Sequence, residues 1–414
     1  MPSPDPTAPR PRRRILVVSN LYPPAVLGGY EVECSGIVAR LREENEVLVL
    51  TSKRGRGEVA GEQGVARVLD FLPHSPRSRL LAPLYALRAA RATRALIREF
   101  GPEVVYVWNG AQIPQVAIRL LELSGARVLV RVCEHWYGKL YETDAFMQGV
   151  RGGRWAPLMR LVNRLPGLRI EAERQVPAAI CWNSATVERM TPVPPTARAV
   201  LERVVIPATR QSESFVGIER RPSPEPSLGF VGRVAPEKGI EVVLRAMARL
   251  EREHGIRASF EIGGSGEPGL IDELKALAAE LGLADRVHWR GRLDVEGLRG
   301  LYAGLHALVV PSTWEEPAPL VIVEGALARV PLVCSRVGGI PDMVRDPEEA
   351  LLFGSGDDEG LCEALRRMLA EPEETAARAE RAYERVQAFR IDRYHEAMDE
   401  FFEAGLAALD AGSA

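Results

Sequence analysis

Two basic side chains, Arg233 and Lys238, follow an apolar run in the motif GFVGRVAPEKG. The run predicts a buried strand, and Gly232 at its end allows the backbone to turn and to approach a ligand closely. Ligands of parallel α/β sheets bind outside the carboxyl ends of the strands. An arginine that clamps two oxygens and a lysine that acts as a point charge would suit a diphosphate there. Taken alone, the motif is equally compatible with an exposed basic turn.

A pair of glutamates, Glu316 and Glu324, stands in the segment EPAPLVIVE. Pro317 and Pro319 suit the first turn of a helix but not its interior, which places Glu316 before the helix. Glu324 would lie about two turns inside it, roughly 12 Å away, a distance similar to that from a nucleotide's ribose to a sugar on its diphosphate. The diphosphate would lie at the helix N-terminus, where free N–H groups and the dipole favour anions. The alternative is a solvated Glu316 and an unrelated Glu324.

Glycine-rich turns offer weaker candidates for contacts to phosphate. Gly28 and Gly29 follow the first apolar run, and Gly264 lies in IGGSGEPG between a predicted strand and a predicted helix. Glycine permits a close approach of the backbone to a ligand, but each of these turns is also compatible with an ordinary loop.

The elements that must position these residues alternate between short apolar runs and helical patterns. In the first half, the predicted strands are 15–19, 46–52, 104–108 and 127–133, and the predicted helices are about 31–42, 80–100 and 114–123. This alternation predicts a parallel sheet with helices on both faces. The pattern restarts after the Pro/Ser/Arg-rich segment 219–227, which is typical of a linker between two domains.

Length and composition agree with a two-domain globular protein. The 414 residues are too many for one ordinary core, and 46% hydrophobic with 26% charged residues is usual for globular chains. A formal net charge of −3 gives no indication of nucleic-acid binding. The five cysteines lack zinc or redox spacing, which predicts reduced, buried thiols. We recognise neither a secretory signal nor an apolar run near the ~20 residues of a membrane span, so we expect a cytoplasmic protein.

As an ordered series, these motifs resemble the family 4 glycosyltransferases of the GT-B fold. The resemblance is strong over 228–371 and looser in the first half, and it is carried by GFVGRVAPEKGIEVVLRAM, IGGSGE, VHWRGRL, VPSTWEEPAPLVIVEGALARVPLV, VGGIPDMV and NLYPPAVLGGYE. It implies an α/β fold of two Rossmann-like domains that face a central cleft. It also implies transfer of a sugar, with retention, from a nucleoside-diphosphate sugar (a UDP- or GDP-sugar foremost) to a hydroxyl of a glycan, glycolipid or natural product, without a metal or other cofactor.

The resemblance further implies roles for single residues. Arg233 and Lys238 would bind the diphosphate and stabilise its charge as the leaving group departs. Glu316 would contact the donor sugar and Glu324 the ribose. The remaining expected donor contacts are Gly28, Gly29, Gly232, Gly264, Leu320 and Val321, with Arg290 or its neighbours Gly291 and Arg292 near the nucleobase.

The first half is less sharply matched to the family. His135, in RVCEHWYGK, falls where relatives carry a histidine near the donor sugar, but Glu134 could occupy the same place. Two segments depart from the family pattern. Glu316-Pro317-Ala318-Pro319 stands where relatives often carry E-G-F-G, and Ala208-Thr209 stands where many carry Asn-Gly. Neither removes a charged residue, so we expect changed contacts and retained activity.

The predicted organisation has four parts. They are a disordered Pro/Arg-rich tail (1–13), an acceptor domain (14–210), a donor domain (211–390) and a helix that returns to the first domain (391–414). The basic stretches 80–98 and 151–174 leave open a peripheral contact with anionic lipid or an ordinary solvated face. The sequence gives no indication of the oligomeric state.

Two alternatives from other classes are kept at this point. One is a nucleotide-sugar 2-epimerase of similar architecture, which would need its own acid/base carboxylates in the cleft. The other is a nucleotide-sugar binder that has lost catalysis.

Overall fold

The computed structural model describes residues 12–57, 62–72, 81–134, 136–138, 144–152, 156–164 and 174–412. The chain forms two compact units. The first consists of Met1–Asn183, Glu188–Val205 and Met398–Ala414, and the second of Ser184–Val187 and Ile206–Ala397.

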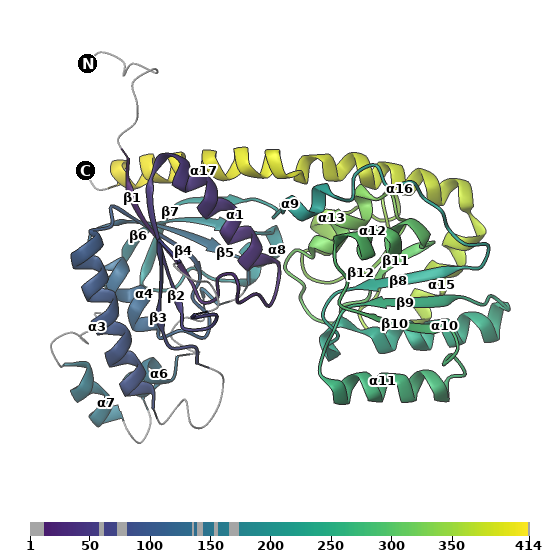
Figure 1. Cartoon of the computed structure of the whole chain (residues 1–414), viewed down its shortest axis with the longest axis horizontal. Coiled ribbons are helices and arrows are strands. Elements are labelled where there is room, and N and C mark those ends of the chain that lie inside the picture. The colour runs from purple at the N-terminus through teal and green to yellow at the C-terminus, as the bar shows by residue number, and fades with distance from the viewer. Residues whose placement is uncertain are drawn as a thin grey trace, which may run out of the picture. The chain divides into compact units, whose positions relative to one another are not determined.

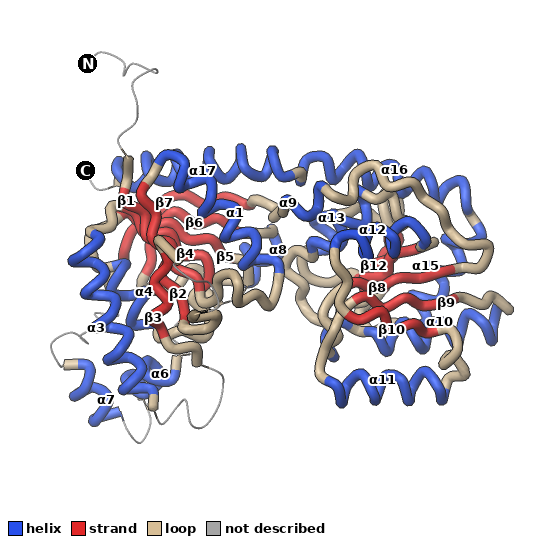
Figure 2. The backbone as a smooth tube through the Cα atoms, in the orientation of Figure 1, coloured by secondary structure: helices blue, strands red, loops and turns tan. Residues whose placement is uncertain are grey.

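Within the described residues, the first unit contains a seven-stranded parallel sheet of order β3-β2-β1-β4-β5-β6-β7 (Figures 1 and 2). Its strands are β1 (Arg14–Ser19), β2 (Glu46–Ser52), β3 (Val65–Leu69), β4 (Val104–Asn109), β5 (Arg127–Val132), β6 (Val176–Trp182) and β7 (Ala197–Val204). Its helices are α1 (Gly29–Glu44), α3 (Ala82–Phe100), α4 (Gln115–Glu122), α6 (Ala145–Arg151), α7 (Ala156–Asn163) and part of α8 (Ala185–Met190).

Strands β1, β4 and β5 inside this sheet are short, mostly apolar runs because both of their faces are covered. Every residue of β4 is buried, which is typical of a parallel strand between two helical layers. Helix α3 has a proline in its first turn and ends at Gly101, whose φ of 57° is left-handed. Sequence periodicity predicted β1, β2, β4 and β5 nearly to their ends, whereas β3, β6 and β7 were not among the predicted strands.

The second unit contains, among the described residues, a six-stranded parallel sheet of order β10-β9-β8-β11-β12-β13. Its strands are β8 (Ser227–Val231), β9 (Ser259–Gly263), β10 (Val287–Gly291), β11 (Ala307–Val310), β12 (Leu332–Ser335) and β13 (Leu351–Phe353). Its helices are α9 (Arg210–Glu213), η1 (Pro236–Lys238), α10 (Ile240–His254), α11 (Pro268–Glu280), α12 (Val295–Gly304), α13 (Leu320–Leu327), α14 (Ile340–Met343), α15 (Asp358–Ala370), α16 (Pro372–Val386) and η2 (Gln387–Phe389).

Strand β11 separates two hydrophobic cores of the second unit. Ala307 and Val309 belong to the core that includes α10 and α15, whereas Leu308 and Val310 belong to the core that includes α13 and α16. Successive side chains of a strand point to opposite faces, so one short strand contributes to both layers.

The last helix, α17 (Ile391–Ala411), begins in the second unit, and its residues from Met398 onward belong to the first. Within the first unit, Glu403 of α17 pairs with Arg13 at 2.7 Å. The ring of Phe402 lies 6.0 Å from that of Tyr106 on β4. The predicted C-terminal helix that returns to the first domain is therefore present.

Two sequence-based expectations need comment. Of the predicted tail, residues 1–11 lie outside the described part, and Arg13 is held by Asn45 as well as by Glu403. The segment 219–227 is not a free linker, because it lies within the second unit, where the Arg220 guanidinium donates to the Tyr302 carbonyl. A Pro/Ser/Arg-rich composition resembles that of a linker even where the segment, although largely exposed, is hydrogen-bonded within one unit.

Candidate functional site

The loops at the carboxyl ends of β8 and β9 meet through two predicted glycines. Gly232 has a φ of 154° and Gly264 a φ of 151°, and a Cβ on Gly264 would lie only 1.8 Å from the Gly232 carbonyl oxygen. The Gly232 N–H donates to Gly263 at 2.9 Å. The two loops thus require glycine for their own packing, a reason that does not depend on a ligand.

The basic pair Arg233 and Lys238 follows β8. The Arg233 side chain is 57% exposed and pairs with Glu237 at 2.6 Å, whereas the Lys238 side chain is only 19% exposed. Lys238 ends the short helix η1, and Gly239 after it has a φ of 70°. A Cβ on Gly239 would lie 2.0 Å from the Pro311 carbonyl oxygen, so glycine allows η1 to pack against the loop after β11.

This packing brings Lys238 to Glu316. The lysine Nζ donates to Oε1 at 2.8 Å and to Oε2 at 2.6 Å. Two further donors reach Oε2, Ser312 Oγ at 2.8 Å and Trp314 Nε1 at 2.9 Å. The Gly339 N–H also holds the backbone carbonyl of Glu316 at 2.7 Å. A buried carboxylate is therefore paired with a cation and bonded on both oxygens, as burial of charge requires.

Glu324 lies inside helix α13 in a different environment. It is buried, and the Tyr302 hydroxyl donates to its Oε2 at 3.0 Å. Burial raises the pKa of Glu324 to about 7. The N-cap of α13 is Pro319, which provides no side-chain cap, and Leu320 and Val321 in the first turn are half-buried. The N–H groups of Leu320 and Val321 in this turn can donate to an anion.

Arg290 lies on β10, the edge strand of the same sheet. Its guanidinium is 53% exposed and donates to Glu261 at 2.6 Å. The strand order places β10, β9, β8 and β11 side by side and parallel. The structure therefore brings Arg290, Gly264, Arg233 and Glu316 to the side of the sheet on which the carboxyl ends of the strands lie.

The predicted residues of the first unit lie near the ends of β1 and β5. Gly28 is the N-cap of α1 and Gly29 its first residue. The Gly28 N–H donates to the Glu31 carboxylate at 2.9 Å, so this donor already has a partner. His135 lies outside the described residues. Glu134 follows β5 and accepts a hydrogen bond from Asn109 at 2.8 Å.

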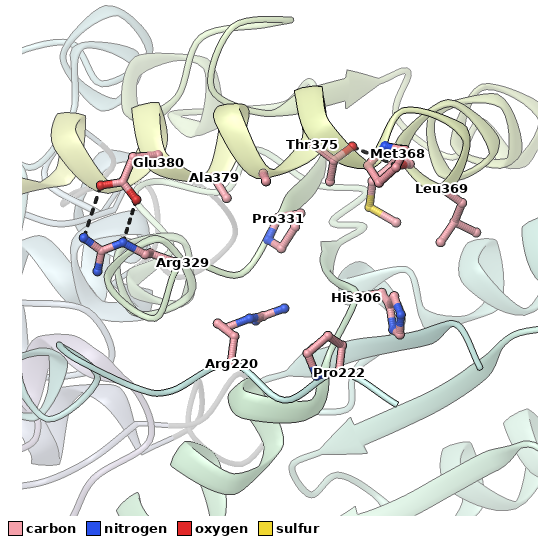
Figure 3. A pocket seen from close by; sticks show the side chains of 12 residues that line it. Arg220, Pro222, His306, Arg329, Pro331, Met368, Leu369, Thr375, Ala379 and Glu380 are labelled. Atoms are coloured by element: carbon pink, nitrogen blue, oxygen red, sulfur yellow. Dashed lines mark hydrogen bonds and ion pairs between the residues drawn. The ribbon is translucent and has the colours of Figure 1, made fainter. Parts of the chain in front are cut away.

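A pocket of about 410 Å³ lies on the opposite side of the second unit's sheet, at the amino ends of β11 and β12. His306 and Pro331, which line it, directly precede β11 and β12, and α16 forms its other side (Figure 3). Arg220 in this pocket donates to the Tyr302 carbonyl near the end of α12, and Arg329 pairs with Glu380. The described residues that line this pocket include none of those predicted to bind the nucleotide-sugar.

Sequence reasoning missed Ser312, Trp314 and Tyr302. All three are neutral residues, and the first two stand inside the motif VPSTWEEPAPLVIVE. The proximity of Ser312 and Trp314 to Glu316 on the chain was visible, but their hydrogen bonds depend on the path of the loop between β11 and α13. A search restricted to charged residues could not identify them.

Comparisons with known proteins agree with this arrangement. The sequence model of the family "Glycosyl transferases group 1" matches residues 211–385. The D-inositol 3-phosphate glycosyltransferase of Acidothermus cellulolyticus is 31% identical over 380 residues, which cover 87% of this chain and 83% of that protein. The chain belongs to the group 1 glycosyltransferases. Several other curated relatives are matched over less than half of their own length.

Solved structures of glycosyltransferases share the fold of this group 1 member. Sucrose-phosphate synthase from Thermosynechococcus elongatus has a TM-score of 0.70 at 20% identity and covers 96% of this chain and 100% of that one. HepE of Anabaena in complex with UDP has a TM-score of 0.66 at 17% identity and covers 94% and 100%. The predicted GT-B fold with two Rossmann-like domains is confirmed.

These findings also bear on the alternatives and on the surroundings of the site. A nucleotide-sugar 2-epimerase receives no support from the matches, which are to glycosyltransferases. The family match covers the segment that carries Arg233, Lys238, Glu316 and Glu324. Within the described chain, no group of three or more His, Cys, Asp or Glu side chains is arranged to hold a metal ion. No described helix is both long and apolar enough to cross a bilayer.

Proposed function

We propose that this group 1 glycosyltransferase is a retaining family 4 enzyme that moves a sugar from a nucleoside-diphosphate sugar to a hydroxyl acceptor. The observation that carries the proposal is the ion pair of Lys238 with the buried Glu316, beside the uncapped N-terminus of α13. A cation, a carboxylate and helix N-terminal N–H groups at the carboxyl ends of neighbouring parallel strands suit a diphosphate with an attached sugar.

Each group has one part in the proposed reaction. Lys238 and Arg233 bind the diphosphate together with the N–H groups of Leu320 and Val321. Glu316 accepts a hydroxyl of the sugar. Glu324 accepts the ribose hydroxyls, and Arg290 lies near the base.

The proposed step is a front-face displacement at the anomeric carbon. The bond from the acceptor oxygen to this carbon forms on the face from which the phosphate leaves. The bond to the leaving phosphate oxygen breaks, and that oxygen takes the acceptor's proton. Fixed cations stabilise the charge that develops on the diphosphate, which is why we expect no metal requirement.

The donor and acceptor classes rest on relatives. HepE of Anabaena is described in complex with UDP and with UDP-glucose, which supports a nucleotide-sugar donor, with UDP- and GDP-sugars first. The relative from Acidothermus cellulolyticus is named for D-inositol 3-phosphate, which supports a hydroxyl on a small phosphorylated polyol as one acceptor to test. Glycans, glycolipids and natural products remain in the acceptor panel.

The test is a panel of UDP-, GDP-, ADP- and dTDP-sugars with the unchanged chain, Lys238→Ala, Glu316→Gln and the control Arg221→Ala. Arg221 is 73% exposed and pairs only with Glu219 in the described chain, so its loss should leave binding unchanged. We expect one nucleotide to bind, Lys238→Ala to weaken its binding, and Glu316→Gln to lose sugar transfer. The anomeric configuration of the product, read by NMR, tests retention, and activity in excess EDTA tests metal independence.

Two outcomes would redirect the proposal. Binding of a nucleotide-sugar without transfer to any acceptor would favour the binder that has lost catalysis. Absence of binding to every nucleotide would overturn the donor site. In the first unit, either His135 or Glu134 faces the donor sugar in this proposal, and comparison of His135→Ala with Glu134→Gln decides between them.

A peripheral membrane contact forms a second part of the proposal, in a cytoplasmic setting. Helix α3 exposes Arg88, Arg91, Arg94 and Arg98, together with Leu84 at 42% exposure. A basic face with exposed apolar groups suits anionic lipid. Half of the second basic stretch, 151–174, lies outside the described residues. Flotation with phosphatidylglycerol vesicles, compared with phosphatidylcholine vesicles, tests this contact, and equal flotation with both would refute it.

A further inference from the structure

The two oxygens of the Glu316 carboxylate carry unequal numbers of hydrogen bonds. Oε2 accepts from Lys238 Nζ at 2.6 Å, Ser312 Oγ at 2.8 Å and Trp314 Nε1 at 2.9 Å. Oε1 accepts from Lys238 alone among the described residues, at 2.8 Å. A carboxylate oxygen has about two lone-pair directions, so Oε2 is saturated and Oε1 keeps acceptor capacity.

The neutral donors differ from Lys238 in one respect that matters for a ligand. In the proposed function, Lys238 also binds the diphosphate when a donor is present, so its Nζ is shared between Glu316 and the ligand. Ser312 and Trp314 belong to the same loop as Glu316, and the Glu316 N–H itself donates to the Trp314 carbonyl at 2.7 Å. They therefore keep the buried carboxylate bonded after the lysine has found a second partner.

Trp314 also lies against the cation. Lys238 Nζ is 5.7 Å from the centroid of the indole ring, within the range of a cation–π contact. One side chain thus faces both members of the Lys238–Glu316 pair, with its N–H on the carboxylate and its ring toward the ammonium. Ser312 is 1% exposed, so its hydroxyl has little access to water as an alternative partner.

We propose that Trp314 and Ser312 are positioning residues that hold Oε2 of Glu316, so that Oε1 accepts a hydroxyl of the donor sugar. This inference rests on the proposed function, because it assumes that Glu316 faces the sugar. It adds that the contact between Glu316 and the sugar depends on two uncharged side chains, those of Trp314 and Ser312.

The experiment compares Trp314→Phe and Ser312→Ala with the control Thr313→Val. Phenylalanine keeps an aromatic face and removes the N–H, and alanine removes only the hydroxyl. Thr313 stands between the two residues and is exposed, and its hydroxyl donates to the Glu237 carbonyl instead of to Glu316. Glu316→Gln is included as the reference for loss of the carboxylate.

The measurement is calorimetric affinity for a nucleotide-sugar and for its nucleoside diphosphate. The pairs are UDP-glucose with UDP, GDP-mannose with GDP, ADP-glucose with ADP and dTDP-glucose with dTDP, and the pair that the unchanged chain binds best is used throughout. We expect Trp314→Phe and Ser312→Ala each to weaken nucleotide-sugar binding about tenfold and nucleoside diphosphate binding less than about twofold. Thr313→Val should change neither affinity.

Retained affinity for the nucleoside diphosphate shows that a variant is folded, and the ratio of the two affinities reports the sugar contact alone. If both variants keep the ratio of the unchanged chain while Glu316→Gln lowers it, the positioning role is refuted and the proposed function stands. If a variant weakens both ligands equally, its side chain supports the loop in general and the inference is overturned. If Glu316→Gln also keeps the ratio, or no pair binds, the donor assignment fails and the inference fails with it.

Discussion

The pKa of Glu324 leads to a sharp prediction about donor binding. The carboxyl group is buried in α13, which raises its pKa to about 7, and the Tyr302 hydroxyl is its hydrogen-bond partner. Ribose hydroxyls can donate to a carboxylate, which accepts on both oxygens, better than to a neutral acid. Donor binding should therefore favour the ionised form and release a proton, so the affinity should rise with pH.

The magnitude follows from the ionised fraction. With a pKa of about 7, Glu324 is about 90% ionised at pH 8 and about 10% ionised at pH 6, so the affinity should be about tenfold weaker at pH 6. The assay is calorimetry with an intact nucleotide-sugar, because its diphosphate is esterified at both ends and does not titrate between these values. Glu324→Gln stays neutral, so its affinity should change less than about twofold between pH 6 and pH 8.

A second variant tests the direction. The Tyr302 hydrogen bond lowers the pKa of Glu324 and so opposes the effect of burial. In Tyr302→Phe the pKa should rise further, and the loss of affinity should begin at a higher pH than in the unchanged chain. Equal affinity of the unchanged chain at pH 6 and pH 8, or the same pH dependence in Glu324→Gln, would refute the reasoning.

Three further predictions concern stability. Because the pKa of Glu324 in the folded chain lies above the ordinary 4.5, its contribution to folding stability is fully present below pH 4.5 and is lost as pH rises through about 7, by about 3 kcal/mol at most. The thermal midpoint of Glu324→Gln, compared with that of the unchanged chain, should therefore be raised more at pH 8 than at pH 5. An equal difference at both pH values would contradict this prediction. Gly264→Ala places a Cβ 1.8 Å from the Gly232 carbonyl oxygen and should lower the free energy of unfolding, measured by denaturant titration, by more than about 2 kcal/mol. The control Gly300→Ala adds a Cβ in open space on α12 and should leave the free energy of unfolding unchanged or raise it. Arg131→Met leaves the buried Glu33 without the guanidinium that bonds it at 2.8 Å and should destabilise by about 3–5 kcal/mol, and Glu33→Leu in the same chain should recover part of that loss.

The sequence was most informative where burial and spacing act together. The apolar run 104–108 predicted β4, because a strand covered on both faces must be apolar throughout. Pro317 and Pro319 correctly placed Glu316 before α13 and Glu324 inside it. Local rules suffice for such features because the neighbouring residues on the chain determine them.

Features that depend on distant residues were beyond this reasoning. The bond from Lys238 to Glu316 joins residues far apart on the chain and requires Gly239 to pack beneath Pro311. Gly232 and Gly264 were expected to serve a phosphate, but their close contact with one another was not foreseeable from two separate motifs. The segment 219–227 resembled a linker because composition does not reveal that Arg220 bonds the end region of α12.

The side chains of β11 alternate between two hydrophobic cores, which constrains how this enzyme can change. Ala307 and Val309 belong to one core and Leu308 and Val310 to the other, so a shift of one residue would move every side chain of the strand into the opposite core. The register of β11 therefore fixes where the loop with Ser312, Trp314 and Glu316 begins. Substitutions within this loop leave the strand in place, whereas an insertion or deletion in the strand before it would disrupt both cores at once.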